Sequence, residues 1–348
     1  MKITFRWYGE NDRVTLEKIR QIPVVSGVVS AIYDVPAGAV WSKESIKKLS
    51  DACHKNGLEF EVVESVPVHE DIKSGRPNAK LYTENYKTNI RNLAEYGVKC
   101  ICYNFMPVFD WLRSELSAPL ADGSNALAYS HDAVLKMNPL ISELSLPGWD
   151  ASYTREGLKE LLNEYKAVDE EALWKNLENF LKEIIPVAES VGIKMAIHPD
   201  DPPWGIFGLP RIVTNRANIE RLLGLVDSPS NGITLCTGSL GAAKENDLTE
   251  IIKTARGRIG FVHLRNIKRS NERDFSETAH PSACGDIDMY GVLKTLKENG
   301  FDGYIRPDHG RMIWGETGRY GYGLFDRALG ACYIAGLVEA VEKLKIES

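Results

Sequence analysis

The sequence predicts an α/β fold, a (β/α)8 TIM barrel with a large insertion after the fourth strand. Short apolar runs alternate with segments of helical period along the chain. In addition, four candidate metal ligands each stand at the C-terminal end of a different run, where such barrels place their catalytic groups. A length of 348 residues suits one barrel with insertions, so residues 1–348 are predicted to form a single domain.

Eight runs rich in β-branched and apolar residues are expected to be the barrel strands. Polar residues or glycines bound each run, as is typical of short buried strands. Their alternation with helical segments indicates parallel pairing, and eight such units fit a closed barrel better than an open sheet. The predicted strands cover residues 3–8, 24–32, 59–65, 99–105, 194–199, 232–236, 260–264 and 303–308.

Segments with apolar residues at helical spacing lie between these strands. Residues 42–55 begin with Ser42, a favoured N-cap residue, which predicts a helix there. Similar patterns predict helices over residues 85–96, 171–190, 218–225, 248–255 and 290–298. Glycines expected to end helices shortly before a strand are Gly57, Gly97, Gly192 and Gly300.

One connection is much longer than the others. About 60 residues separate the fourth predicted strand from the helix that begins near Val168, which is long for a barrel loop. The segment 106–167 contains Trp111, Trp149 and the turn-forming pair Asp122-Gly123, and it is too apolar for a disordered linker. Insertions after a barrel strand fall on the catalytic face, so this segment is predicted to be a lid. A contact between copies of the chain in a homo-oligomer is the alternative, and the two roles can coexist.

The composition is that of a globular protein, with 43% hydrophobic and 26% charged residues. A net charge of -6 predicts no extended basic surface for nucleic acid. The first residues contain no apolar stretch of signal-peptide length, and no run approaches the roughly 18 apolar residues of a membrane span, so a cytoplasmic location is expected. In a reducing cytosol, Cys53, Cys100, Cys102 and Cys332 are expected to be small buried residues.

The candidate metal ligands are His198, Cys236, His263 and Asp308. Because side chains alternate along a strand, all four share the inward direction and should converge on one point. Two imidazoles, a thiolate and a carboxylate suit Mn²⁺, Fe²⁺ or Zn²⁺ and do not suit Ca²⁺ or Mg²⁺. Cys236 is the least secure ligand on chemistry alone, since buried free cysteines are common core residues. Asp200 either hydrogen-bonds a ligand histidine or caps a turn.

Cationic and aromatic side chains are expected to surround this centre and bind a small acidic substrate. Arg265 shares the inward direction of His263 and could hold a carboxylate in a bidentate fork, with a salt bridge at the barrel rim as the alternative. The residues predicted to bind substrate are Arg6, Tyr8, Arg265, His280 and Arg306.

Several stretches resemble the mannonate dehydratase family of hexuronate (glucuronate) catabolism. They are HPDDPPWGIFGLPRI from His198, NGITLCTGS from Asn231, FVHLRN from Phe261, ETAHPSACGDIDM from Glu277, RPDHGRM from Arg306, GYGLFDR from Gly321 and the N-terminal FRWYG. The resemblance spans the second half of the chain and implies a barrel similar to that of xylose isomerase. It also implies dehydration of D-mannonate to 2-dehydro-3-deoxy-D-gluconate with Mn²⁺ or Fe²⁺.

The resemblance matches His198, Cys236, His263 and Asp308 to the metal ligands of that family, and His309 and Tyr322 to its acid and base. Elimination of water needs two such groups, because a proton leaves C2 and the C3 hydroxyl departs only with a proton. His309 is the expected donor. Tyr322 can be the base only if a metal or another cation lowers its pKa from about 10, and the reverse assignment stays open.

Three other functions are compatible with a barrel of this kind. A metal-dependent sugar isomerase would act on a neutral sugar, for which the surrounding arginines are unexpected. A non-catalytic sugar-acid binding protein would not need both His309 and Tyr322. A DNA-repair nuclease is disfavoured by the acidic net charge of the chain.

Overall fold

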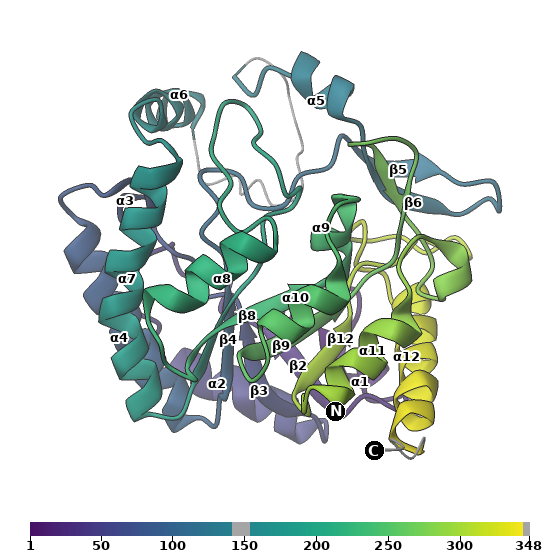
Figure 1. Ribbon diagram of the computed structural model, residues 1–348. Coiled ribbons are helices and arrows are strands. Elements are labelled where there is room, and N and C mark those ends of the chain that lie inside the picture. Colours follow the sequence, from purple (N-terminus) through teal and green to yellow (C-terminus); the bar gives the residue numbers. More distant parts are fainter. Residues whose placement is uncertain (141–153, 344–348) are drawn as a thin grey trace.

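The computed structural model describes residues 1–140 and 154–343. Its centre is a closed barrel of eight parallel strands surrounded by helices (Figure 1), which confirms the predicted (β/α)8 barrel. The strand order around the barrel is β1-β12-β9-β8-β7-β4-β3-β2. The barrel strands are β1 (Lys2–Arg6), β2 (Gly27–Ser30), β3 (Glu59–Glu64), β4 (Cys100–Tyr103), β7 (Lys194–Ile197), β8 (Asn231–Cys236), β9 (Ile259–Leu264) and β12 (Tyr304–Pro307).

Each barrel strand coincides with one of the eight predicted runs, although several runs extended past the observed strand ends. The range 24–32, for example, shortens to Gly27–Ser30. Apolar residues continue into the connecting loops there, and a hydrophobic pattern cannot distinguish a buried loop end from a strand. The strand identities were therefore predictable from the sequence, and their exact lengths were not.

Several helix ends lie at the predicted signals, although α4 begins at Ala79, six residues before the predicted start at residue 85. Ser42 accepts a hydrogen bond from the backbone N–H of Ser45, as expected for an N-cap. The four expected C-terminal glycines all adopt the left-handed conformation, with φ between 71° and 86°. The helices outside the segment between β4 and α7 are α1 (Leu16–Ile19), α2 (Lys43–Lys55), α3 (Glu70–Ser74), α4 (Ala79–Glu95), α7 (Glu170–Ser190), α8 (Arg216–Leu225), α9 (Thr237–Ala242), α10 (Leu248–Thr254), α11 (Met289–Glu298) and α12 (Phe325–Lys343).

Small and apolar side chains fill the barrel interior. Cys100 and Cys102 of β4 are buried there, together with Ala196 and Phe261, while Cys53 is buried on α2. The prediction that Cys332 is buried was wrong, because this residue is exposed on α12. Apolar residues occur nearly all around α12, so the sequence pattern does not tell which side faces inward.

A second sheet of four short strands, with the order β10-β11-β6-β5, was not predicted. It joins a hairpin that follows β4 to a hairpin that follows β9, since Tyr129 of β6 pairs with Phe275 of β11. The predicted turn residue Gly123 connects β5 and β6 and has a φ of 83°. The four strands are β5 (Glu115–Pro119), β6 (Asn125–Tyr129), β10 (Ile267–Arg269) and β11 (Phe275–Glu277). The helices α5 (His131–Lys136) and α6 (Arg155–Tyr165) follow β6 along the chain.

The second sheet, α5 and α6 lie at one end of the barrel, whereas both chain termini lie toward the other (Figure 1). Residues 141–153 of the predicted insertion, with Trp149, lie outside the described residues. The role of segment 106–167 as a lid or as an oligomer contact stays a prediction.

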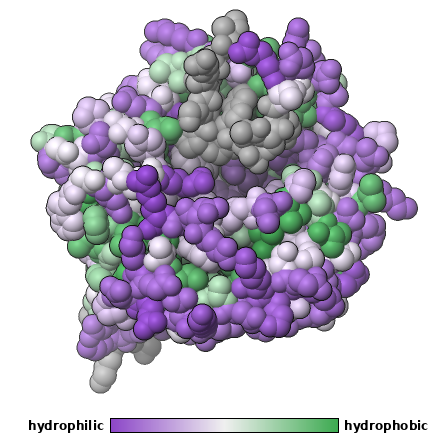
Figure 2. Space-filling view, turned by 180° about the vertical axis from the view of Figure 1, so that it is seen from behind, coloured by the Kyte–Doolittle hydropathy of each residue, from purple (hydrophilic) through white to green (hydrophobic). Residues whose placement is uncertain are grey.

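Hydrophilic residues cover most of the face seen from behind, and hydrophobic residues form scattered areas between them (Figure 2). Among residues 1–140 and 154–343, no helix is long and apolar enough to cross a membrane.

Candidate active site

The four predicted metal ligands lie at the C-terminal ends of four neighbouring barrel strands. Cys236 is the last residue of β8 and is in register with His263 of β9. His198 directly follows β7, and Asp308 directly follows β12. The barrel therefore brings these strand ends together as the sequence predicted.

Donor atoms of these side chains are spaced as ligands of one ion would be. The imidazoles of His198 and His263 approach to 3.2 Å between Nε2 and Nδ1, and both lie in a group with Cys236 whose ligand atoms are all within 4.8 Å. Asp308 stands beside this group, 3.7 Å from Cys236 Sγ and 3.8 Å from His263 Nδ1. Bonds of about 2.0–2.3 Å to one ion place neighbouring donors roughly 3–4 Å apart, so the group of His198, Cys236 and His263 is compact enough for a divalent metal, with Asp308 next to it.

Asp308 is held in its ionised form by arginines. Its Oδ1 lies 2.8 Å from Arg306 Nη2, and its Oδ2 lies 3.2 Å from Arg265 Nη1. Burial opposes ionisation, but Arg306 and the other nearby cationic groups hold the pKa of Asp308 well below its usual range. A carboxylate in this state is ready to bind a cation.

Glu64, at the end of β3, is a site residue that the sequence analysis missed. Its Oε2 lies 3.3 Å from His263 Nε2, on the opposite edge of the imidazole from His198 and Asp308. Burial raises its pKa, but Arg306, His263 and Arg6 outweigh that effect and lower it well below the usual value. Its negative charge lies beside the Nε2 edge of His263, so the Nδ1 edge is the one that faces His198 and Asp308.

His309 and Tyr322 form the predicted pair of proton-transfer groups. The Nε2 atom of His309 lies 2.9 Å from the Tyr322 hydroxyl, and both side chains are buried. Burial, together with Tyr8 and Asp308, raises the pKa of Tyr322 well above 10. With the protein groups alone, Tyr322 is therefore a protonated hydroxyl, and its predicted use as a base depends on a further positive charge.

The predicted substrate-binding residues differ in whether their polar atoms already have partners within the protein. Arg6, Tyr8 and Arg306 line the same pocket as His309. The Nε and Nη1 atoms of Arg306 are buried without a hydrogen-bond partner among the described residues. Arg265 also lines the pocket, but its Nη2 donates to Asp201 at 2.6 Å. Part of its guanidinium is therefore in a salt bridge, which was the alternative to binding a carboxylate of the substrate.

Two other predicted side chains lie apart from the reacting groups. His280 is buried but does not line the pocket, and its ring lies close against Gly330 of α12. Burial lowers the pKa of His280 to about 4, so the ring is neutral. Asp200 accepts a hydrogen bond from the backbone of Val213 at 2.8 Å, while His198 Nδ1 contacts the carbonyl of Pro199, so Asp200 stabilises its own loop.

The pocket contains further residues that the sequence analysis did not select as site residues. Trp111, from the segment between β4 and β5, lies against His309 with ring centroids 4.7 Å apart. Arg319 lies over the Tyr8 ring at 4.2 Å. Position at a strand end could have revealed Glu64, whereas Trp111 and Arg319 lie in loops and carry no such signal. The further lining residues are Glu64, Ser65, Cys102, Tyr103, Asn104, Asp110, Trp111, Asp201 and Arg319.

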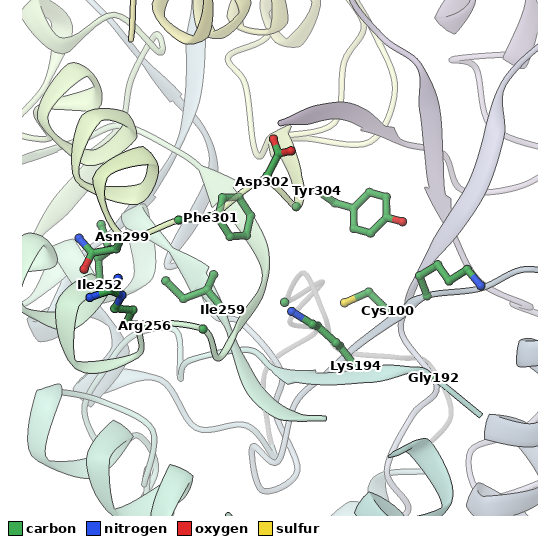
Figure 3. A pocket seen from close by; sticks show the side chains of 15 residues that line it. Cys100, Gly192, Lys194, Ile252, Arg256, Ile259, Asn299, Phe301, Asp302 and Tyr304 are labelled. Atoms are coloured by element: carbon green, nitrogen blue, oxygen red, sulfur yellow. The ribbon is translucent and has the colours of Figure 1, made fainter. Parts of the chain in front are cut away.

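A second pocket opens at the opposite end of the barrel, where β4, β7, β9 and β12 begin (Figure 3). Its charged side chains include Lys194, Arg256 and Asp302. Both groups of candidate metal ligands found among the described residues lie outside it. The pocket at the C-terminal strand ends is therefore the candidate active site.

Comparisons with known proteins identify the family of this chain. A model of the D-mannonate dehydratase (UxuA) family matches residues 1–348. Mannonate dehydratase 2 of Halalkalibacterium halodurans is 59% identical over 343 residues, which cover 98% of this chain and 99% of that protein. Mannonate dehydratase of Streptococcus uberis is 58% identical over 345 residues, with 99% of each chain covered.

Solved structures show the same relationship. The crystal structure of mannonate dehydratase from Streptococcus suis serotype 2 matches with a TM-score of 0.92 and 48% identity, covering 100% of this chain and 99% of that one. A D-tagatose 3-epimerase-like protein matches with a TM-score of 0.55 at 16% identity over 99% of each chain, a likeness of fold alone.

Fold and site together define an enzyme built on a TIM barrel like that of xylose isomerase. The chain belongs to the D-mannonate dehydratase family and is a carbon–oxygen hydro-lyase. This confirms the resemblance seen in the sequence and decides against the isomerase, binding-protein and nuclease alternatives.

Proposed function

We propose that this chain converts D-mannonate to 2-dehydro-3-deoxy-D-gluconate in hexuronate (glucuronate) catabolism. The observation that best supports this proposal is the joint placement of the His309–Tyr322 pair and a compact set of metal donors at the C-terminal strand ends. Several arginines line the same pocket, as a negatively charged sugar acid requires.

The proposed cofactor is Mn²⁺ or Fe²⁺, held by His198, Cys236, His263 and Asp308. When bound, the ion would supply positive charge that stabilises the negative charge developing on the substrate oxygens. The mixture of nitrogen, sulfur and oxygen donors supports a first-row transition metal over Ca²⁺ or Mg²⁺.

Arg306 is the proposed principal anchor of the substrate carboxylate, with Arg6 and Tyr8 beside it. Unpaired buried N–H groups are costly, and two of those on Arg306 are free to receive a carboxylate oxygen. Arg265 contributes mainly charge, because Asp201 and Asp308 engage its guanidinium. His280, which lies off the pocket, is the least supported of the five substrate residues.

Two groups move protons in the proposed reaction. The preferred assignment gives Tyr322 the removal of the C2 proton and His309 the protonation of the departing C3 hydroxyl. The raised pKa of Tyr322 means that this assignment needs the charge of the bound ion to offset the effect of burial. The resulting enol then tautomerises to the 2-keto acid.

The test is an assay of the metal-loaded protein on a panel of six-carbon aldonates, with the 2-keto-3-deoxy acid as the measured product. D-mannonate is expected to give product with Mn²⁺ or Fe²⁺, and its C2 and C3 epimers much less. Absence of product from D-mannonate with both ions would overturn the proposal.

We also propose that segment 106–167 acts as a lid, that the enzyme forms homo-oligomers, and that it is cytoplasmic. The lid is supported by Trp111 of this segment, which lies beside His309 in the pocket. Light scattering of the purified protein tests the oligomer, and a monomer at micromolar concentration would contradict it.

A further inference from the structure

The His309 imidazole has a second partner, on the side away from Tyr322, which the proposed reaction does not use. Glu277, the last residue of β11, places its two carboxylate oxygens 2.8 Å and 3.0 Å from His309 Nδ1. Both side chains are buried. The imidazole is therefore held between a carboxylate at Nδ1 and a hydroxyl at Nε2.

A carboxylate can only accept hydrogen bonds when it is ionised, so it keeps the hydrogen of His309 on Nδ1. Burial raises the pKa of Glu277, but His309, Arg113 and Arg265 outweigh that effect and lower it. Nε2, the atom that faces Tyr322, is then the nitrogen that gains or loses the reacting proton.

A competing partner lies close to the same nitrogen. Arg265 Nη1 is 3.2 Å from His309 Nδ1, and an arginine can only donate. If Glu277 were neutral or absent, Arg265 would become the hydrogen-bond partner of Nδ1, and the hydrogen of a neutral imidazole would move to Nε2. Glu277 therefore decides between two tautomers of His309.

Arg113, from the segment between β4 and β5, holds Glu277 in place. Its Nε and Nη2 donate to Glu277 Oε1 at 3.0 Å and 2.7 Å. The same guanidinium donates to both carboxylate oxygens of Asp201, at 2.8 Å and 3.0 Å. The connection after β4 thus supports a carboxylate that comes from the connection after β9.

We propose that Glu277 is a positioning residue that fixes the tautomer and the ring orientation of His309, with Arg113 fixing Glu277. This inference rests on the proposed function in one respect, namely that His309 transfers a proton in the reaction. It extends that function by making the two loop connections parts of the catalytic apparatus.

The test compares Glu277→Gln with the parent enzyme in steady-state kinetics on D-mannonate. Glutamine keeps the size of the side chain but can present an N–H group to Nδ1, so kcat should fall by about 100-fold or more. The KM and the metal content per subunit should change less than about threefold, because Glu277 contacts neither the proposed carboxylate anchor nor the metal donors. A kcat within about threefold of the parent value would refute the proposal.

The matched control is Glu70→Gln, which disrupts another buried ion pair, with Lys73 at 2.7 Å, outside the pocket. It is expected to lower the melting temperature while leaving kcat near the parent value. An equal loss of kcat in this control would show that Glu277→Gln acts through stability alone, and would also refute the positioning role.

A second readout does not depend on turnover. Nitrogen-15 NMR of histidine-labelled protein distinguishes the two imidazole tautomers, and His309→Asn assigns the signals. The parent should show the hydrogen on Nδ1, and Glu277→Gln should shift the population toward Nε2. The same signals in both proteins would refute the inference, even if D-mannonate proved not to be the substrate. If Glu277→Gln does not fold, Arg113→Lys provides the same comparison with a weaker expected shift.

Discussion

Cys236 distinguishes the proposed metal centre from sites built only of nitrogen and oxygen donors. Its sulfur is fully buried, 3.7 Å from Asp308 and in the same compact group as His198 and His263. Buried cysteines are common, so residue type alone does not make Cys236 a candidate ligand. Its position at the end of a predicted strand does, and its sulfur lies in one group with the donor atoms of His198 and His263.

Replacement of Cys236 by serine is expected to lower the affinity for Mn²⁺ or Fe²⁺ by at least about tenfold, since a hydroxyl is a poorer ligand than a thiolate. The measurement is metal content after dialysis against a weak chelator. Cys53 is buried on α2 and belongs to neither candidate metal group, so Cys53→Ser should retain its metal. Parent-like affinity in Cys236→Ser would exclude the sulfur from the metal site.

The roles of His309 and Tyr322 can be separated by proton exchange. In deuterated water, substrate recovered before turnover gains deuterium at C2 if the base acts without completing elimination. With Tyr322 as base, His309→Asn should retain this exchange and Tyr322→Phe should lose it, while both variants lose about 100-fold or more in kcat. The opposite pattern would make His309 the base, in line with the raised pKa of the tyrosine.

Helix α12 packs closely against the loop that carries His280, and this contact should contribute to the free energy of unfolding. A Cβ atom at Gly330 would lie 2.4 Å from His280 Nδ1, whereas one at Gly336 of the same helix would meet nothing within 4 Å. Gly330→Ala should therefore destabilise the fold by about 1–3 kcal/mol. Gly336→Ala should be neutral or stabilise it by up to about 1 kcal/mol.

Urea unfolding of the two alanine variants measures this difference directly. Equal midpoints would show that the helix moves freely to accommodate the added methyl group. In that case the close contact between α12 and His280 would have no energetic weight.

The barrel strands could be predicted because their pattern is local and strongly apolar. The second sheet could not, since β10 and β11 have three residues each and their pairing with β6 depends on contacts far apart in sequence. The same distinction applies to the site. Strand position made Cys236 and His263 candidates, whereas the role proposed for Glu277 depends on a tertiary contact with His309 that no periodicity shows.

For the molecule as a whole, burial of His280 couples stability to pH. Its pKa is about 4 in the folded state, against about 6.5 when exposed, so the unfolded chain binds more protons between these values. Stability should therefore fall as the pH decreases from about 6.5 to about 4. At pH 5 the contribution of this one residue is on the order of 1–2 kcal/mol.

Thermal unfolding at pH 7 and pH 5 checks this expectation in the parent and in His280→Asn. Between pH 7 and pH 5, the melting temperature of the variant should fall by less than that of the parent, because asparagine does not titrate. This holds whatever the stability of the variant at pH 7. An unchanged difference would mean that other groups account for the acid sensitivity.

The small sheet β10-β11-β6-β5 has a consequence for how members of this family can diverge. The loop after β4 and the loop after β9 are joined by the pairing of β6 with β11, although β7 and β8 lie between their parent strands in the barrel. A change in the length or register of one loop should therefore require a matching change in the other. A chimera that imports residues 115–129 from a relative should fold well only when residues 267–277 come with them. The two loops would therefore be inherited as one exchangeable unit, although more than a hundred residues of chain lie between them.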